Sequence, residues 1–476
     1  MRHLILALAL TAAPAAAPVP ASAAEVPHPA PPVAAPVAVP VPAAEATHPA
    51  PPVAASIAVP VPAAEASHPA PPVAASVAVP APAAAAVTAS TADLAAPALP
   101  ASRAEAVVPT PPLAALRPTL LAEIDHRTYG DTVEGNSGFA IARLRPGLAL
   151  TPAPGVRAAA VVEFASERPA ILDTWLALRA ADWAEVTIGY SKPPLFASFA
   201  EPVHTTPVPD RAPVVTAFRV RRDVGIDLRL TPRDLPVEAR LRIGNGTGSA
   251  LGNDNALPAG YAAVDLVLGR ARRGSDAANG LRLGVAGFAE DARDRDGIVG
   301  QTPLGFVYAR PVVVSGRRLV GEAHAIGWLG PLRLTIEGAA SHEARTGDDG
   351  GDPATARVAL DPIHGFGATA ELVYLLVGDP RRPGQAPGPG AFEAALRYDG
   401  LWLARGADDV RPTGGQGGAA GLKWWAAEYL AASLTGYLTR YDEPPIEAPD
   451  RRWSWGLVAR ASLFWGLGGG APPPSP

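Results

Sequence analysis

Hydrophobic and polar residues alternate with a period of two along most of the chain from Pro118 to Trp465. In the clearest stretch, 218–230, one face holds Phe218, Val220, Val224, Ile226, Leu228 and Leu230, and the other holds Arg219, Arg221, Asp223, Asp227 and Arg229. The same pattern recurs at 237–243, 332–337, 392–399 and 453–465. Alternation of this kind is typical of β-strands that carry two different faces.

These alternating runs are long for a soluble protein. Many reach about ten residues, whereas strands of soluble proteins average about 5–6 and a tilted strand needs about 9–11 to cross a membrane. Since every backbone amide must be paired within a bilayer, strands cross it only as a closed barrel. We count about 16 or 17 candidate segments, and bacterial barrels favour even numbers. The sequence therefore predicts an all-β fold, a transmembrane antiparallel β-barrel of about 16 strands over residues 117–466.

The N-terminal part of the chain, residues 1–116, does not have this alternating pattern. Residues 1–24 combine a basic start, an apolar run and small residues, which predicts a cleaved signal peptide and export. In residues 25–116 the motif His-Pro-Ala-Pro-Pro-Val-Ala-Ala recurs at His28, His48 and His68, with neither glycine nor an aromatic residue. Frequent proline favours extended polyproline II, so we expect a disordered periplasmic Pro/Ala-rich linker. We expect residues 467–476 to be a disordered tail.

Composition narrows the class of protein. The chain has no cysteine, which excludes a disulfide scaffold, a thiolate metal site and a cysteine nucleophile. A net charge of −5 argues against a nucleic-acid binder. After residue 116 acidic and basic residues are nearly balanced, and only Lys192 and Lys423 are lysines. A polar face rich in both signs of charge, opposite an aliphatic one, favours a water-filled lumen over a soluble β-sandwich.

Aromatic residues gather near the ends of the predicted strands. In membrane barrels, amphipathic rings lie at the level of the lipid headgroups. We therefore expect interfacial girdles built from Trp175, Trp183, Tyr190, Trp328, Trp402, Trp424, Trp425, Tyr429, Tyr437 and Tyr441.

Several short motifs occur in the order in which one family of bacterial porins carries them. They span residues 175–179, 186–196, 222–225, 243–248, 390–398, 421–425 and 461–465. On these motifs the stretch 117–465 resembles the phosphate-selective porin O/P family of bacterial outer-membrane proteins. The resemblance implies a 16-stranded, trimeric porin in the outer membrane, with cationic side chains that line the passage and attract anions. The family's selective members place several lysines at the constriction, where this chain has only two in all.

These features predict passive diffusion of small hydrophilic solutes through an arginine-lined pore, with a weak preference for anions such as phosphate. Guanidinium groups stay charged and offer a planar fork of donors to oxyanions. We expect the proline-rich stretch from Pro193 to Val215 to fold inward as a constriction. The candidate pore-lining residues are Arg219, Arg221, Arg229, Arg240, Arg242, Arg282, Arg333 and Arg397, with Asp223, Asp227, Glu238, Glu337 and Glu393 between them to temper the field.

The sequence leaves two other classes of function open. The first is a structural or adhesive outer-membrane barrel with a plugged lumen, tethered to the cell wall through the repeated linker. The second is a barrel enzyme such as a lipid hydrolase, although the sequence has no Gly-x-Ser-x-Gly and no His-Glu-x-x-His motif. We therefore expect no enzymatic activity, no cofactor, no metal and no nucleic-acid partner.

Two groups of polar residues lack the spacing of a metal site. The acidic stretch 290–296 does not fit a twelve-residue calcium loop, so we expect a solvated extracellular loop there. The histidines outside the linker are scattered without ligand spacing, and we expect pore or loop residues at His126, His204, His324, His342 and His364.

Overall fold

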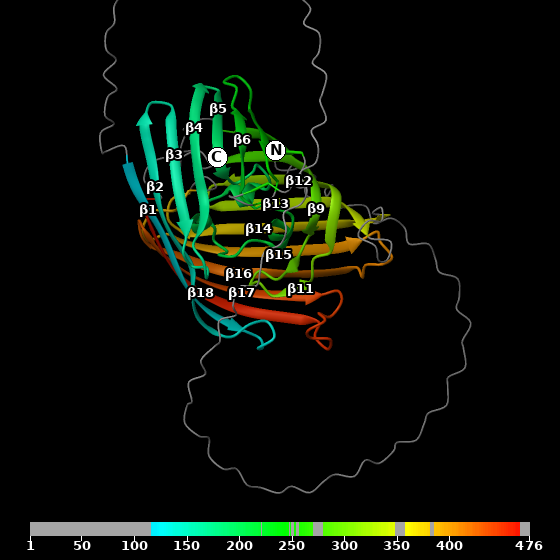
Figure 1. Cartoon of the computed structure of the whole chain (residues 1–476). Helices are drawn as coiled ribbons and strands as arrows, with labels where there is room; N and C mark the ends of the chain where they lie inside the picture. The colour runs from blue at the N-terminus through cyan, green and yellow to red at the C-terminus, as the bar shows by residue number, and fades with distance from the viewer. Residues whose placement is uncertain are drawn as a thin grey trace, which may run out of the picture. The chain divides into compact units, whose positions relative to one another are not determined.

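The chain closes into a β-barrel. The computed structural model describes residues 116–219, 221–246, 248, 252–253, 257–269, 279–347, 358–380 and 385–466. Within these residues sixteen strands pair antiparallel in sequence order, and the last strand pairs with the first (Figure 1). The predicted antiparallel barrel of about 16 strands is confirmed.

The barrel strands are β1 (Leu116–Tyr129), β2 (Gly138–Ala153), β3 (Val156–Glu163), β4 (Ala170–Ala181), β5 (Ala184–Ser191), β6 (Asp223–Leu230), β7 (Val237–Gly244), β8 (Ala259–Gly269), β9 (Asn279–Asp296), β12 (Val313–Leu329), β13 (Leu332–Gly347), β14 (Val358–Val377), β15 (Phe392–Arg405), β16 (Thr413–Ala427), β17 (Leu430–Tyr441) and β18 (Trp453–Trp465). Short elements lie in the connections: α2 (Ala197–Ala200), η2 (Val203–Thr205), α3 (Pro213–Phe218) and the paired strands β10 (Gly300–Gln301) and β11 (Val307–Ala309). No helix in the described part of the chain has the length and hydrophobicity needed to cross a membrane.

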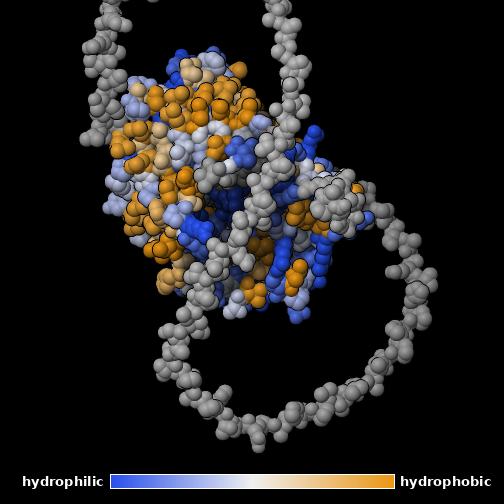
Figure 2. Space-filling view, in the orientation of Figure 1, coloured by the Kyte–Doolittle hydropathy of each residue, from blue (hydrophilic) through white to orange (hydrophobic). Residues whose placement is uncertain are grey.

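The predicted alternation sorts the side chains between the outside and the lumen. In β18 every second residue is exposed outward, including Trp455 and Leu457, whereas Arg460 and Phe464 are buried toward the lumen. Ile243 on β7 is 64% exposed, although it is hydrophobic. Figure 2 shows hydrophobic residues over much of the outer surface and hydrophilic ones in the hollow at its centre. A hydrophobic outer surface around a polar lumen is the arrangement that a β-barrel needs in a lipid bilayer.

The predicted aromatic girdles are correct only in part. Trp183, Trp424 and Tyr429 are about half exposed and face outward, as expected. Trp425 and Tyr437 are buried instead, as are Trp328 and Tyr441. The reason is strand geometry: Trp424 and Trp425 are consecutive, so they must point to opposite faces.

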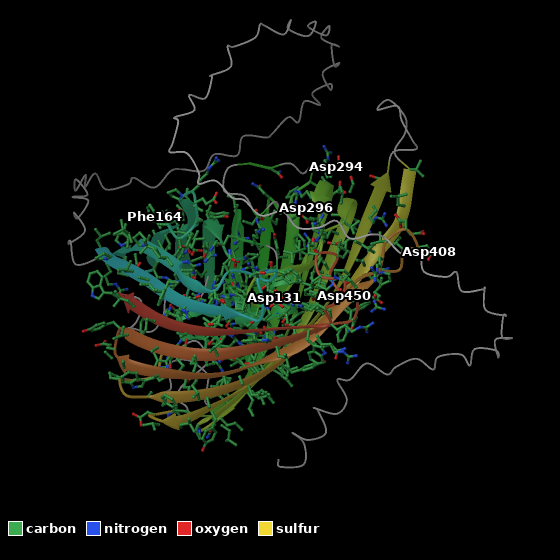
Figure 3. All side chains as sticks on the ribbon, turned by 90° about the horizontal axis from the view of Figure 1, so that it is seen from below. Asp131, Phe164, Asp294, Asp296, Asp408 and Asp450 are labelled. Carbon is green, nitrogen blue, oxygen red and sulfur yellow. The ribbon has the colours of Figure 1, made fainter. Side chains whose placement is uncertain are left out.

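The two ends of the barrel differ in their connections. Two-residue turns join β2 to β3, β4 to β5, β12 to β13 and β16 to β17, whereas β5–β6 and β9–β12 are joined by residues 192–222 and 297–312. We call the end of the barrel with the two-residue turns the turn end, and the opposite end, with the long connections, the loop end. Figure 3 labels Asp131, Asp408 and Asp450, which lie on loop-end connections. In outer-membrane barrels short turns face the periplasm and long loops face outward.

Two local predictions are wrong. The strand predicted over 218–230 begins only at Asp223, because Pro213 starts a short helix that ends at Phe218 inside the lumen. Arg219 and Arg221 therefore belong to a connection, and Val220 lies outside the described residues.

The acidic stretch 290–296 is also not a loop. It continues β9, which carries on past a register shift near Asp294, a residue with a φ of 46°. In this strand the buried Glu290 faces the lumen and accepts hydrogen bonds from Arg295 and Arg318.

Several predictions lie outside the described residues. They are the signal peptide at 1–24, the linker up to residue 115 and the tail at 467–476. The last residue of the predicted linker, Leu116, begins β1.

Candidate solute pathway

The β5–β6 connection folds into the lumen, as predicted for Pro193 to Val215. We call residues 192–222 the inner loop. Side chains from the barrel wall hold its backbone at widely separated points. Glu337 accepts the Ser198 N–H at 2.8 Å, and Lys423 donates to the His204 carbonyl at 2.5 Å. Arg397 donates to the Asp210 carbonyl at 2.6 Å. The inner loop is therefore fixed across the barrel rather than projecting from it.

One side of the inner loop is apolar and packs on the barrel wall. Phe218, Val214 and Val215 are fully buried in a cluster that includes Leu401 on β15. Gly367 on β14 permits this contact, since a Cβ there would lie 2.7 Å from Val214. The apolar contact seals the part of the lumen that lies next to β13, β14 and β15.

A second connection adds to this seal. Residues 297–312, between β9 and β12, fold inward so that Ile298, Tyr308 and Ala309 join the same cluster. The rings of Tyr308 and Tyr441 lie 5.2 Å apart. Sequence reasoning did not find this second inward segment, because its turn residues resemble those of any solvated loop.

The other side of the inner loop faces open space. A cavity of about 790 Å³ lies between it and the wall formed by β1 to β4. It runs from Arg117 and Gly466, near the turn end, to Gln301 and Pro303 in the second inward connection. This cavity is the candidate pathway for a solute.

The cavity is lined mainly by positive charge. Its acidic side chains are Asp173 and Asp210. Its basic side chains are Arg117, Arg143, Arg145, Arg157, Lys192, Arg211, Arg219 and Arg222.

Four of these cations come from the inner loop itself, and three of the four surround one aromatic ring. Lys192, Arg211 and Arg219 lie 5.2, 5.1 and 5.2 Å from the centroid of Phe199. Lys192 donates to the Phe199 carbonyl at 2.8 Å, and Arg211 donates to the carbonyls of Ser198 and Glu201. Within the described residues none of the three forms an ion pair. We call Lys192, Arg211 and Arg219 the basic triad.

The environment opposes the charges of the basic triad. Burial, together with the positive charges of Arg211 and Arg222, holds the pKa of Lys192 well below its ordinary value. Burial and the charge of Arg219 lower the pKa of Arg211 to about 9. Burial and the charges of Arg221 and Arg222 lower the pKa of Arg219 to about 10. An anion that entered the cavity would relieve this unfavourable electrostatic energy.

Apart from the exposed Arg117 at the turn end, the remaining cations of the cavity have acidic partners. Arg222 forms two hydrogen bonds with Asp173, at 2.9 and 3.1 Å. Arg145 pairs with Glu163, Arg157 with Glu185, and Arg143 with Glu123. The uncompensated positive charge is therefore concentrated on the inner loop.

Six of the predicted pore-lining arginines face the lumen but are paired with acidic side chains of the wall or, for Arg333, also of the inner loop. Arg229 pairs with Glu238 at 2.7 Å, and Arg240 pairs with Asp227 at 2.7 Å. The other four have partners of the same kind: Arg242 near Asp227, Arg282 with Glu238, Arg333 with Glu201 and Glu371, and Arg397 with Asp399. Arg221 is exposed on the connection before β6. Of the eight, only Arg219 lines the cavity.

The predicted acidic residues also face the lumen and are engaged there. Asp223 accepts the Gly246 N–H at 2.6 Å, and Glu393 accepts the Trp425 indole N–H at 2.9 Å. Asp227 and Glu238 hold the arginines named above, and Glu337 holds the inner loop. The role of these residues in solute passage stays a prediction.

Sequence reasoning missed Lys192 and Arg211, which the structure places beside Arg219. A signal for them existed. Arg211 lies on the stretch that was expected to fold inward, and Lys192 directly precedes it, so neither has the fixed cross-strand neighbours of a strand residue. Strand arginines such as Arg240, by contrast, stand close to acidic residues of the next strand.

The histidines occupy three different environments. His324 faces the lumen, 2.9 Å from Glu322 and 2.7 Å from Asp265, and His204 is buried in the inner loop. Burial lowers the pKa of His204 to about 4, with a further contribution from Lys423. His126, His342 and His364 alternate with buried lumen residues and so point outward, which corrects their prediction as pore or loop residues. Within the described residues no group of three or more acidic or histidine side chains is placed to hold a metal ion.

The fold is similar to those of solved outer-membrane proteins. The anion-selective porin from Comamonas acidovorans shares 10% identity, with 74% of this chain and 99% of that chain covered and a TM-score of 0.49. The outer-membrane channel DcaP of Acinetobacter baumannii shares 9% identity, with 74% and 96% covered and a TM-score of 0.48. The trimer form of OmpT from Vibrio cholerae shares 9%, with 74% and 99% covered and a TM-score of 0.47.

Comparison of this sequence with protein-family models and with curated proteins finds no relative. No protein-family model matches this chain, and no curated protein matches it. The resemblance to the porin O/P family therefore stays a prediction from the motifs.

Proposed function

We propose that this protein is an outer-membrane porin, through which small hydrophilic solutes diffuse with a preference for anions such as phosphate. The observation that carries the proposal is the basic triad beside the cavity of about 790 Å³. Three neighbouring cations without ion pairs among the described residues attract mobile anions.

The surroundings of the basic triad favour transport over tight capture. Conduction needs binding that is strong enough to admit a solute and weak enough to release it. Arg145 and Arg157 continue the positive charge along the cavity toward Arg117, near the turn end. Because Glu163 and Glu185 offset the charges of Arg145 and Arg157, an anion that leaves the basic triad meets no deeper trap.

The hydrophobic outside of the barrel supports a membrane location. Its exposed leucine, isoleucine and tryptophan side chains match a lipid-facing belt. Export through the signal peptide at 1–24, insertion in the bacterial outer membrane, a homotrimeric state and cell-wall contact of the linker belong to the same proposal. They rest on the sequence pattern and on the porin resemblance.

A second candidate function has one structural observation in its favour. The two inward connections place an apolar cluster around Phe218, Tyr308 and Leu401 inside the lumen. A barrel plugged in this way suits a structural or adhesive protein that holds the cell wall through its linker. Swelling of liposomes in a permeant sugar separates the two candidates, because a plugged barrel gives no swelling.

Conductance in a planar bilayer tests the porin proposal. We expect discrete conductance steps and, in a potassium chloride gradient, a reversal potential of the sign that chloride preference gives. Changing both Arg211 and Arg219 to Gln should move that potential toward zero. Arg221→Gln is the matched control, since Arg221 is an exposed neighbour that does not line the cavity. Absence of steps would refute the pore, and a cation preference of the unaltered protein would refute the role of the basic triad.

A further inference from the structure

The outer face of the barrel carries a row of basic side chains on three adjacent strands. His342 on β13 stands opposite His364 on β14, and His364 stands opposite Arg405 on β15. The two imidazole rings are 5.1 Å apart. A register shift in β15 beside Ala404, which has a φ of 56°, brings Arg405 into line with the outward-facing His364. We call His342, His364 and Arg405 the outer row.

The outer row lies at the upper border of the hydrophobic belt. His342 is ten residues beyond Leu332, where β13 starts at the turn end. At about 3.3 Å per residue and a tilt of about 40°, ten residues rise about 25 Å, which is the height of the apolar band in such barrels. Phe366 and Trp402 face each other directly below His364 and Arg405. The outer row therefore sits at headgroup level, with aromatic rings below it at acyl-chain level.

No acidic side chain among the described residues pairs with Arg405 of the outer row. Arg405 is exposed, and the described residues offer it no ion pair. Arg317 on β12 also faces outward but stands opposite an acidic residue, Asp291, and we leave it out of the row. An arginine at a lipid-facing position is costly unless it reaches polar headgroups. An imidazole N–H donates to phosphate oxygen in either protonation state, and a guanidinium donates in a bidentate manner.

We propose that the outer row binds the phosphate group of an outer-leaflet lipid, while the rings of Phe366 and Trp402 pack against its acyl chains. This site is distinct from the solute pathway, because its residues point away from the lumen. It gives the barrel a fixed lipid contact on the face formed by β13, β14 and β15.

Native mass spectrometry of the full-length protein released from detergent tests the proposal. The probes are a bisphosphorylated lipid A and the same lipid with both phosphates removed. We expect the protein to retain the phosphorylated lipid at least tenfold more than the dephosphorylated one. The triple variant His342→Ala, His364→Ala, Arg405→Ala should lose this difference. Arg440→Ala is the matched control, since Arg440 also faces outward but lies near the ring of Trp453.

Three outcomes would overturn the proposal. One is equal retention of the two lipids by the unaltered protein, a result that needs no variant to fold. Another is an Arg440→Ala effect as large as that of the triple variant. The third is loss of the bound lipid on adding millimolar inorganic phosphate, which would indicate a site for free phosphate. Conductance and reversal potential should not change in the triple variant, so a failure here leaves the porin proposal to its own test.

Discussion

Arg460 in the last strand donates hydrogen bonds of 2.6 and 2.8 Å to the two carboxylate oxygens of Asp125 in the first strand. Both side chains are almost fully buried, at 2% and 0% exposed. The same guanidinium also reaches the Pro209 carbonyl in the inner loop at 3.1 Å. The Arg460 side chain therefore helps to hold the first and last strands together and also helps to hold the inner loop in place.

Arg460→Ala should therefore weaken both features. Removing one partner of a buried ion pair costs roughly 3–5 kcal/mol of unfolding free energy, and we expect a smaller loss here because Arg127 also donates to Asp125, at 2.9 and 3.0 Å. We expect a lower urea midpoint by tryptophan fluorescence in detergent, together with noisier single-channel currents. Arg411→Ala is the control, since its pair with Glu443 is largely exposed and should contribute at most about 1 kcal/mol. Equal midpoints for the two variants would contradict this account.

The lipid-facing belt gives a second prediction. Leu241 on β7 points outward and is 51% exposed. Leu241→Arg should destabilise the barrel in lipid vesicles by about 2–4 kcal/mol if the residue lies near the bilayer centre. Leu235→Arg, in the short β6–β7 connection, is the control, because a charge there can reach water. Urea titration in vesicles measures both, and a neutral effect of Leu241→Arg would argue against lipid on this face.

The period-two pattern predicted the barrel well because each strand position faces either lipid or lumen. Ile226, Leu241 and Leu457 point outward as the pattern requires, and Arg229 and Arg460 point inward. The pattern failed where the chain leaves the wall. Phe218 continues the alternation in sequence, yet it ends a helix packed in the lumen.

The solute pathway was harder to predict than the barrel. Sequence alternation identifies which side chains face the lumen, but it does not show which charges remain uncompensated. Arg240 and Arg397 look like Arg219 in sequence, and only the three-dimensional contacts show that Asp227 and Asp399 balance the first two. A charge becomes available to a solute when no strand neighbour carries the opposite sign.

The fit between the inner loop and the wall gives a third prediction. A Cβ at Gly367 would lie 2.7 Å from the Val214 side chain and 3.1 Å from the Gly400 carbonyl. Gly367→Val should therefore push α3 away from β14 and into the cavity on its other side, which lowers the single-channel conductance. Gly338→Val is the control, because a Cβ at Gly338 would meet only the Gly367 carbonyl, at 3.6 Å. Unchanged conductance in Gly367→Val would show that α3 does not limit the pathway.

Lys192 gives the pathway a pH dependence of defined sign. Burial, with the charges of Arg211 and Arg222, lowers its pKa well below the ordinary value of 10.5. A lysine is charged below its pKa, so raising the pH through that value removes one positive charge from the basic triad. Anion preference should consequently fall with rising pH, and it should do so below pH 10.5. Reversal potentials in a potassium chloride gradient, recorded from about pH 5 to 8 and so below the pKa values of about 9 and 10 for Arg211 and Arg219, measure this change. In Lys192→Arg the charge persists across that range, so the fall should be reduced or absent, and a parallel fall in both proteins would assign the titration to another group.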